Sequence, residues 1–173
     1  MKKTCTLIIN LLFVGVILAQ EKLPNPKIGK NETEITSFIM TDYKLAYGGQ
    51  FIYRLSVLRK LKTGAGILYG ANYTSDAIGQ STHGYGAVFA DILQFLGHRQ
   101  KWSLGGQLGQ GIYNDDYVKA GIYYSISGNY RAIVSKKLLF ATSLFIGYRN
   151  FHNSYGYSVY NTVLVGLKAG IVF

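Results

Sequence analysis

The residues that could carry out chemistry in this chain are few. His152 and Ser154 stand two positions apart, in the sequence His152-Asn153-Ser154. A serine hydroxyl can attack an acyl carbon when a histidine accepts its proton, and that histidine needs a third group to orient it. No Asp or Glu follows Asp116, so this part of the chain supplies no orienting carboxylate. The residues alone therefore predict a poor hydrolytic centre.

The same residues resemble the His-x-Ser sequence of the lipid A 3-O-deacylases, which are outer-membrane barrels with a glutamate on the strand that follows. The resemblance implies that His152 and Ser154 would be the base and the nucleophile of a lipid A acyl hydrolase. Tyr155 stands where that family has an asparagine, and the glutamate has no counterpart. We therefore expect a protein that is not an enzyme, with the deacylase-like hydrolase as the alternative.

Signals for a metal or a cofactor are weak. Cys5 is the only cysteine, and His83 and His152 have no complete set of further ligands beside them, so we expect no metal site. The glycine-rich run 105–111 lies within an alternating segment and no helical pattern follows it. A phosphate-binding loop would open a helix, so we expect no cofactor.

The elements that position these residues are best read from the segment 157–173, whose side chains alternate strictly between two faces. One face carries Tyr157, Val159, Asn161, Val163, Val165, Leu167, Ala169, Ile171 and Phe173. The opposite face carries Tyr160, Thr162, Gly166, Lys168 and Gly170. Long period-two alternation is typical of a transmembrane β-strand, whose apolar face meets lipid and whose polar face meets a lumen. A soluble, lipocalin-like barrel would turn the apolar face inward instead.

The amino terminus predicts secretion. Lys2 and Lys3 precede the apolar run 7–18, and Ala19-Gln20 leads into a polar segment, which is the pattern of a cleaved signal peptide. We expect a signal peptide at 1–20, a polar segment at 21–32 and one barrel domain at 33–173. Loss of Lys2 and Lys3 would lower the formal charge from +10 to +8.

Further alternating segments predict the remaining strands. They are expected at 43–57, 63–73, 85–96, 102–113, 118–134, 138–150 and 157–173. Antiparallel closure of a single-chain barrel requires an even number of strands, and the β-branched segment Thr33–Thr41 can supply the missing one. We therefore predict an all-β, antiparallel up-and-down barrel of eight strands. The alternative makes Asn31–Asp42 a short amphipathic helix on the membrane surface.

The connections predict the orientation. Short turns at the end near Phe173 are expected in the periplasm, and the segments 74–84, 114–117 and 151–156 are expected as outer loops that form the contact surface. The expected periplasmic charges are Arg59, Lys60, Lys62, Arg99, Lys101, Lys136 and Lys137, and the outer ones are Asp42, Asp76, Asp115 and Asp116. An outer aromatic girdle is expected from Tyr43, Tyr47, Tyr73, Tyr85, Tyr113, Tyr117, Tyr148 and Tyr157. Basic turns suit anionic lipid, so we expect lipid and not nucleic acid as the partner of these charges.

The predicted lumen is filled by small or polar residues and by a charge network. Arg54, Arg131 and Lys168 lie in its periplasmic half, and Asp91 is the one carboxylate that alternation places among them. A buried charge needs a partner, so we expect Asp91 to be a structural counter-ion. Other inner-face candidates are Gly66, Gly70, Asn72, Gly105, Gln107, Gly109, Lys119, Gly121, Tyr123, Ser125, Asn129, Ser143 and Arg149.

The architecture resembles the small outer-membrane barrels, the class that includes OmpX and the membrane domain of OmpA. The signal peptide, the alternating strands and the terminal Phe173 carry that resemblance. It implies a Gram-negative outer-membrane location and delivery by the barrel-assembly machinery, with Phe173 as the assembly signal. We expect a structural or surface-interaction role, with a ligand that the sequence does not identify, and a narrow, porin-like channel as another alternative.

Overall fold

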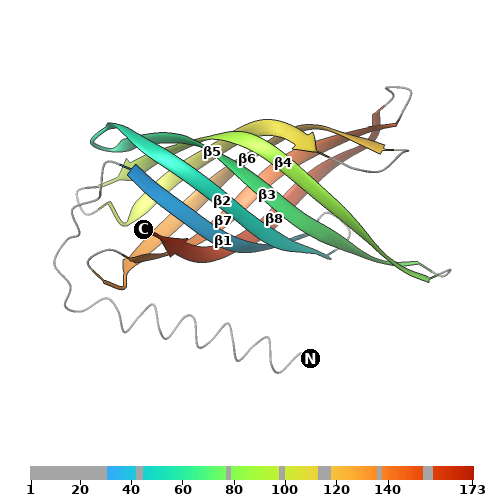
Figure 1. The fold of residues 1–173 in the computed structure, drawn as a ribbon, viewed down its shortest axis with the longest axis horizontal. Coiled ribbons are helices and arrows are strands. Elements are labelled where there is room, and N and C mark those ends of the chain that lie inside the picture. The colour runs from blue at the N-terminus through green and yellow to red at the C-terminus, as the bar shows by residue number, and fades with distance from the viewer. Residues whose placement is uncertain are drawn as a thin grey trace.

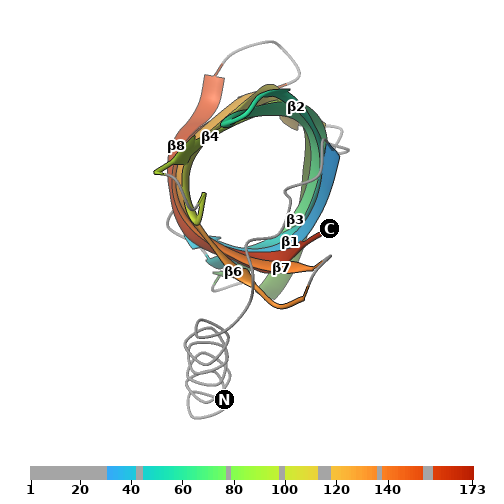
Figure 2. The same cartoon turned by 90° about the vertical axis from the view of Figure 1, so that its left-hand side faces the viewer.

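The chain forms a closed antiparallel barrel of eight strands in sequence order, β1 pairing with β8 (Figures 1 and 2). The structure is a computed structural model that describes residues 31–41, 45–76, 79–97, 100–112, 118–135, 138–153 and 158–173. The strands are β1 (Asn31–Thr41), β2 (Leu45–Leu58), β3 (Leu61–Asp76), β4 (Gly79–Leu96), β5 (Trp102–Ile112), β6 (Val118–Ile133), β7 (Leu139–Asn153) and β8 (Ser158–Val172). No helix in these ranges is long and apolar enough to cross a bilayer. The predicted signal peptide lies outside them.

The segment expected to complete the barrel does so. β1 pairs with β2 from Asn31↔Leu55 to Thr41↔Leu45 and with β8 from Glu34↔Val172 to Thr41↔Val165. Both edges of β1 are therefore hydrogen-bonded, which is what a strand surrounded by lipid requires. The prediction of eight strands is confirmed, and the alternative of a surface helix is wrong. β1 already begins at Asn31, two residues before the expected boundary at Thr33.

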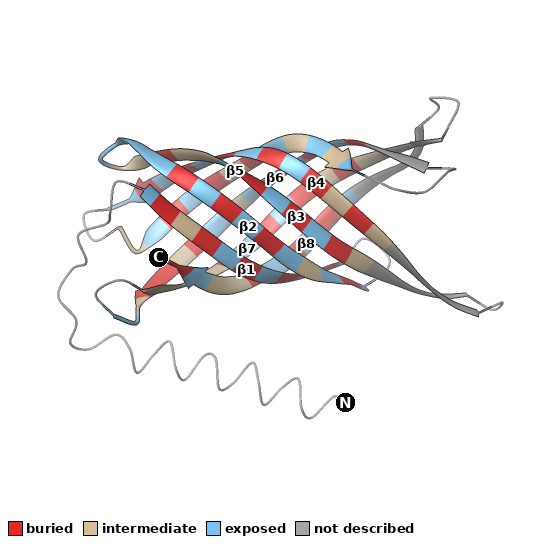
Figure 3. Cartoon of the chain, viewed as in Figure 1, coloured by how far each residue is buried: buried red, intermediate tan, exposed pale blue. Residues whose placement is uncertain are grey.

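The alternation of each strand turns one set of side chains outward and the other inward (Figure 3). In β8, Val163, Val165 and Leu167 are exposed while Leu164, Gly166 and Lys168 are buried. The exposed set across the barrel is made of large apolar side chains, among them Ile35, Phe51, Tyr69, Ile92, Leu108, Ile126, Leu144 and Phe173. The apolar face thus points outward, and the inward-facing arrangement of a soluble barrel is not adopted.

The interior is less uniformly small and polar than the sequence predicted. Large apolar side chains also point inward, including Phe38, Met40, Ile52, Leu68, Phe89, Leu93, Phe95, Phe145 and Leu164. Glycines face several of them: a Cβ on Gly66 would lie 2.6 Å from the Phe89 ring. Small and large inner residues therefore complement one another, which allows eight strands to enclose a filled lumen.

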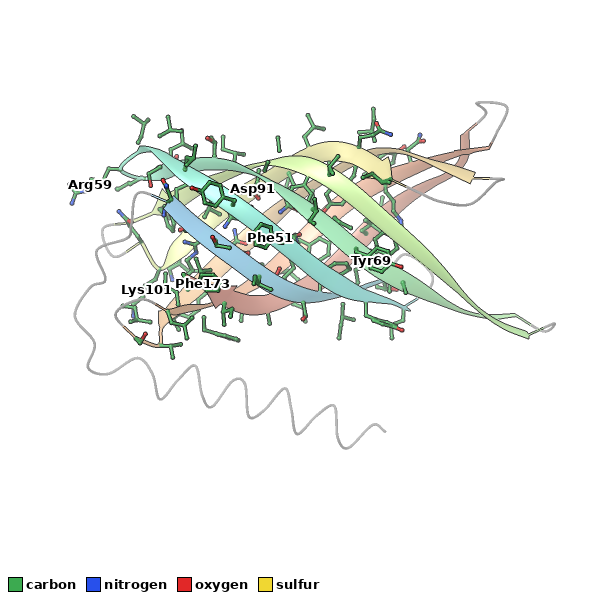
Figure 4. All side chains as sticks on the ribbon, in the orientation of Figure 1. Phe51, Arg59, Tyr69, Asp91, Lys101 and Phe173 are labelled. Atoms are coloured by element: carbon green, nitrogen blue, oxygen red, sulfur yellow. The ribbon has the colours of Figure 1, made fainter. Side chains whose placement is uncertain are left out.

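The two ends of the barrel differ. Arg59, Lys101 and Phe173 lie together at one end, where Arg59 and Lys60 form a tight turn (Figure 4). At the other end β3 and β4 continue to the pair Asp76↔Gly79, so most of the segment 74–84 is a paired hairpin and not the loop that was expected. The other two expected outer loops lie mainly outside the described residues, although Phe151–Asn153 belongs to β7.

The predicted aromatic girdle is wrong in one member. Tyr47 is exposed and Tyr148 is half-buried, but Tyr85 is 6% exposed and points into the lumen. Alternation explains the difference, because Tyr85 shares the inner face of β4 with Ala87 and Phe89. The side chains of the other girdle residues lie outside the described part of the chain.

Candidate functional site: the charged interior

A cluster of charged side chains fills the lumen in the half nearer Phe173. Its members are Glu32 and Glu34 from β1, Arg54 from β2, Lys62 from β3, Asp91 from β4 and Arg131 from β6, all of them buried. Figure 4 labels Asp91 on this half of the barrel. The three carboxylates match the three cations, so the cluster is neutral when all six groups are ionised.

Arg54 lies at the centre of this inner cluster. Its Nη1 donates to Glu34 Oε2 at 2.5 Å and to Glu32 Oε1 at 3.2 Å. Its Nε donates to Asp91 Oδ2, and its Nη2 donates to Asp91 Oδ1 at 3.2 Å. One guanidinium group thus connects β1, β2 and β4 through side chains, using the planar arrangement of donors that suits carboxylates.

Glu32 is the second centre of the cluster. Arg131 binds it with two parallel hydrogen bonds, from Nη1 to Oε2 at 2.9 Å and from Nη2 to Oε1 at 2.7 Å. Lys62 Nζ donates to Glu32 Oε2 at 2.6 Å. The Phe95 ring lies beside both cations, with its centroid 4.9 Å from Arg131 Cζ and 5.8 Å from Lys62 Nζ. These contacts compensate for the loss of hydration that buried ions suffer.

Two expectations about this region are wrong. Asp91 is not the one carboxylate in the lumen, because Glu32 and Glu34 also point inward. Lys62 does not belong to a basic ring in the turns, since it lies inside the barrel against Glu32. Alternation carried the signal for both: Glu34 and Thr36 share a face of β1, and Lys62 and Gly66 share a face of β3.

A second layer of polar side chains lies next to Asp91, on the side of the lumen nearer the hairpin of β3 and β4. Gln107 Nε2 donates to Asp91 Oδ1 at 3.0 Å, and this contact fixes the direction of the Gln107 amide. Gln107 Oε1 then accepts from Tyr123 Oη at 3.1 Å and from Ser125 Oγ at 3.1 Å. Lys168 Nζ donates to Gln107 Oε1 and to Gln50 Oε1, both at 3.0 Å. Lys168 is thus held by amide oxygens and not by a carboxylate.

A mainly apolar layer follows toward the hairpin end of the barrel. Phe38, Met40, Leu68, Tyr85, Ala87, Phe89, Tyr123, Phe145 and Leu164 form one buried cluster there. Arg149 enters this layer with its guanidinium carbon 4.6 Å from the centroid of the Tyr85 ring. A small cavity of about 30 Å³ remains between this layer and Lys168. Buried charged, polar and apolar side chains therefore follow one another along the described part of the lumen.

The structure brings the sequence-predicted network together only in part. Arg54 and Asp91 are bonded, Arg131 joins them through the glutamates, and Lys168 lies in the next layer. The backbone of His152 lies in β7, but its side chain and all of Ser154 lie outside the described residues. No group of three or more His, Cys, Asp or Glu residues that could hold a metal occurs in the described ranges.

The arrangement defines a class of protein. A closed antiparallel barrel with an apolar exterior and a charged, packed interior is a small transmembrane β-barrel of the outer-membrane type. No protein-family model matches the chain, and no curated protein is significantly similar to it. Among solved structures, the crystal structure of Ail, the attachment invasion locus protein of Yersinia pestis, is similar at 13% sequence identity and a TM-score of 0.46. The match covers 83% of this chain and 96% of that chain.

Proposed function

We propose that this protein resides in a Gram-negative outer membrane as a barrel closed to ions, and that it acts as a structural or surface-interaction protein. The observation that carries the proposal is the combination of an apolar exterior with a lumen that an ion cluster fills at one end and a mainly apolar layer fills beyond it. An apolar exterior of this extent needs lipid around it, because exposing so much apolar surface to water costs free energy.

The filled lumen argues against a channel. Eight strands enclose a space just wide enough for side chains, and here it contains three ion-paired carboxylates and the aromatic rings above them. Opening a path would separate these buried ion pairs and leave charges without partners, which is costly. This cost supports the proposal of a closed barrel.

The hairpin of β3 and β4 supports a role at the surface. Its last pairs with neighbouring strands in the described part of the barrel are Ala46↔Asn72 and Gly86↔Ile112, and beyond them the two strands pair only with each other. Figure 1 shows the hairpin extending past the rest of the barrel. Such a projection offers backbone edges to a partner and is held away from the lipid belt.

The end of the barrel near Phe173 supports the proposed lipid and assembly partners. Arg59 is exposed in its turn, and Lys60 and Lys101 are partly exposed near it, where they can contact anionic headgroups. Phe173 is 51% exposed, and its backbone exchanges two hydrogen bonds with Thr33 at 2.7 and 2.9 Å. We assign Phe173 the role of assembly signal for the barrel-assembly machinery.

Conductance tests the closed lumen. The purified barrel in a planar lipid bilayer is expected to give no stable stepwise current. A matched variant in which Glu34, Arg54 and Arg131 are all replaced by serine removes much of the plug and is expected to conduct. Stable ohmic steps from the parent protein would establish the channel instead.

Labelling of intact cells tests the orientation. A cysteine at Ser75, in the hairpin, is expected to react with a membrane-impermeant maleimide. A cysteine at Lys60, in the opposite turn, is expected to react only after the outer membrane is permeabilised. The reverse pattern would overturn the proposed orientation.

A further inference from the structure

Three cations border the apolar exterior at one end of the barrel, the end at which Figure 4 labels Arg59 and Lys101. Arg59 is exposed and directly follows Leu58, which is 65% exposed, and Lys60 comes next in the same turn. Lys101 is partly exposed and directly precedes Trp102, which is 59% exposed on the outer face. Positive charges therefore meet large apolar side chains at this edge, as they do where a barrel passes from acyl chains to lipid headgroups.

Hydrogen bonds join the two turns that carry these cations. Gln100 Nε2, from the connection between β4 and β5, donates to the backbone oxygen of Arg59 at 3.3 Å. The backbone nitrogen of Arg131 donates to the backbone oxygen of Lys101 at 2.8 Å, which attaches the second turn to β6. No exposed Asp or Glu lies at this end in the part of the chain that the structure describes. The two turns thus form one basic edge, whose charge fits an anionic partner.

An aromatic pair lies next to the basic edge on the outer face. The rings of Trp102 and Tyr130 have centroids 4.7 Å apart and an interplanar angle of 54°. Leu96, the cross-strand partner of Trp102, is also exposed. Trp and Tyr prefer the boundary between headgroups and acyl chains, because each ring has a polar end and an apolar body. The pair therefore marks the depth at which a bound lipid changes from headgroup to acyl chain.

A groove of about 490 Å³ opens on the same outer face, further from the basic edge. Its floor is formed by two small residues, Ala90 on β4 and Gly106 on β5. The other outward-facing residues of its lining are larger, namely Thr63, Ile92, Leu108, Tyr124 and Ile126. The volume lies within the range of about 300–1,000 Å³ that is typical of ligand sites. The groove is therefore large enough for part of a small apolar ligand.

The depth of the groove matches that of an acyl chain in the adjacent leaflet. Gly106 lies five residues beyond Lys101 along β5, which corresponds to about 17 Å of strand. A strand inclined by about 40° then reaches a depth of about 13 Å, which is less than the half-thickness of about 15 Å of the hydrocarbon core. A lipid whose headgroup lies at the basic edge can therefore place an acyl chain in the groove.

We propose that this part of the barrel, from the turns at Arg59 and Lys101 to the groove over Gly106, binds one anionic phospholipid of the periplasmic leaflet. The basic edge binds the headgroup phosphate, Trp102 and Tyr130 pack against the glycerol region, and the groove holds an acyl chain. This inference rests on the proposed outer-membrane location and deepens it, because a general attraction of basic turns to anionic lipid becomes one defined site.

A second copy of the chain is the competing occupant of the groove. Copies in one membrane have the same orientation, so a neighbouring barrel would bring its own basic turns to the same depth. Like charges at that edge would then oppose the contact. An anionic lipid instead neutralises the edge, which favours the lipid as the occupant.

Quenching of Trp102 fluorescence measures the headgroup preference, since this single tryptophan lies in the site. The full chain is refolded into phosphatidylcholine vesicles with an increasing fraction of phosphatidylglycerol that has brominated acyl chains, or of brominated phosphatidylcholine as the matched probe. The brominated phosphatidylglycerol is expected to quench at a lower mole fraction, by about fivefold for each cation that contacts the headgroup. Lys101→Gln is expected to reduce the preference by about that factor. Lys119→Gln, which removes a cation at the far end of β6, is expected to keep it.

Native mass spectrometry tests the groove and the stoichiometry. The full chain in detergent micelles, titrated with dioleoyl phosphatidylglycerol, is expected to retain one lipid molecule per barrel. Ala90→Leu fills the groove and is expected to lose this retention. Ala169→Leu makes the same change on the outer face of β8 and is expected to keep it.

The outcomes separate this inference from the proposed location. Equal quenching by the two brominated lipids in inserted protein, or an equal loss of preference in Lys119→Gln, would overturn the lipid site and leave the location standing. Retention by Ala90→Leu equal to that of the parent protein, or a dimer without lipid, would overturn the site as well. Failure of the full chain to insert into the vesicles would overturn both. If Ala90→Leu does not fold, the effect of Lys101→Gln on quenching still decides the question.

Discussion

Replacement of Glu32 by glutamine removes one negative charge from the inner cluster and leaves the shape of the side chain nearly unchanged. Glu32 accepts hydrogen bonds from Arg131 at 2.9 and 2.7 Å, from Lys62 at 2.6 Å and from Arg54 at 3.2 Å. After the change, three buried cations face two carboxylates. The glutamine amide also places N–H donors against groups that are themselves donors.

The expected loss of stability is large. Removing one partner of a buried ion pair costs about 3–5 kcal/mol, because the other charge remains buried without compensation. At about 1.4 kcal/mol per factor of ten, this lowers the folding equilibrium constant by roughly two to four orders of magnitude. Adding Lys62→Met to Glu32→Gln restores neutrality, and we expect the double variant to recover a substantial part of the loss. The coupling between the two sites is expected to be about 1–3 kcal/mol.

Urea unfolding of the barrel in detergent or lipid vesicles measures these differences. Trp102 is the single tryptophan and lies exposed on the outer face. Its fluorescence therefore changes when unfolding moves it from lipid or detergent into water. Ser37→Ala on the exposed face of β1 is the matched control and is expected to change stability by no more than about 0.5 kcal/mol. The reasoning is refuted if Glu32→Gln unfolds within about 1 kcal/mol of the parent, or if the double variant is less stable than the single one.

Three further predictions test the packing, the lipid face and the assembly signal. A methyl group at Gly66 would lie 2.6 Å from the Phe89 ring, so Gly66→Ala should lower the free energy of unfolding in urea by about 1–3 kcal/mol. Nothing lies within 4 Å of a Cβ at Gly128, so Gly128→Ala should leave the stability unchanged. Leu144 is 61% exposed near the middle of β7, so Leu144→Arg should cost about 2–4 kcal/mol in vesicles, and a neutral result would argue against lipid at that position. Phe173→Ala should reduce the fraction of heat-modifiable protein in cells while leaving the unfolding of refolded protein nearly unchanged. If the parent protein and Phe173→Ala assemble equally well in cells, Phe173 is not the assembly signal.

Alternation determined which features of the fold were predictable. The two-residue period of a β-strand places Val163, Val165 and Leu167 on one face and Lys168 on the other, independently of the surroundings. If the apolar face meets lipid, the inward or outward direction of each side chain follows. The need for an even number of strands then selected Thr33–Thr41 as the missing strand. Both arguments depend only on local geometry and on closure of the barrel.

The partners of the inner charges depend on register, which local pattern does not determine. Glu32 lies opposite Arg54 because β1 and β2 pair as Asn31↔Leu55, and it reaches Arg131 across the lumen from β6. A shift by two residues would preserve every inner and outer face while changing each of these contacts. The inward direction of Glu34 was available from alternation, because the expected strand Thr33–Thr41 contains it. Glu32 and Lys62 lay just before the expected starts of their strands, at Thr33 and Thr63, and were therefore missed.

The length of the hairpin was also beyond the local pattern. The segment 74–84 contains Ser, Asp, Gly and Thr, which favour turns, yet β3 and β4 remain paired to Asp76↔Gly79. Pairing with a partner strand already in register extends a hairpin past residues of low strand propensity, because each added pair satisfies two backbone groups.

Membrane fractionation combined with gel migration tests the central claim most directly. Cells that produce the full chain are separated into periplasm, inner membrane and outer membrane, and each fraction is run unheated and boiled. We predict that the protein is found in the outer membrane and migrates differently before and after boiling, as a detergent-resistant barrel does. Recovery as a soluble periplasmic protein with a single migration would contradict an apolar exterior facing lipid.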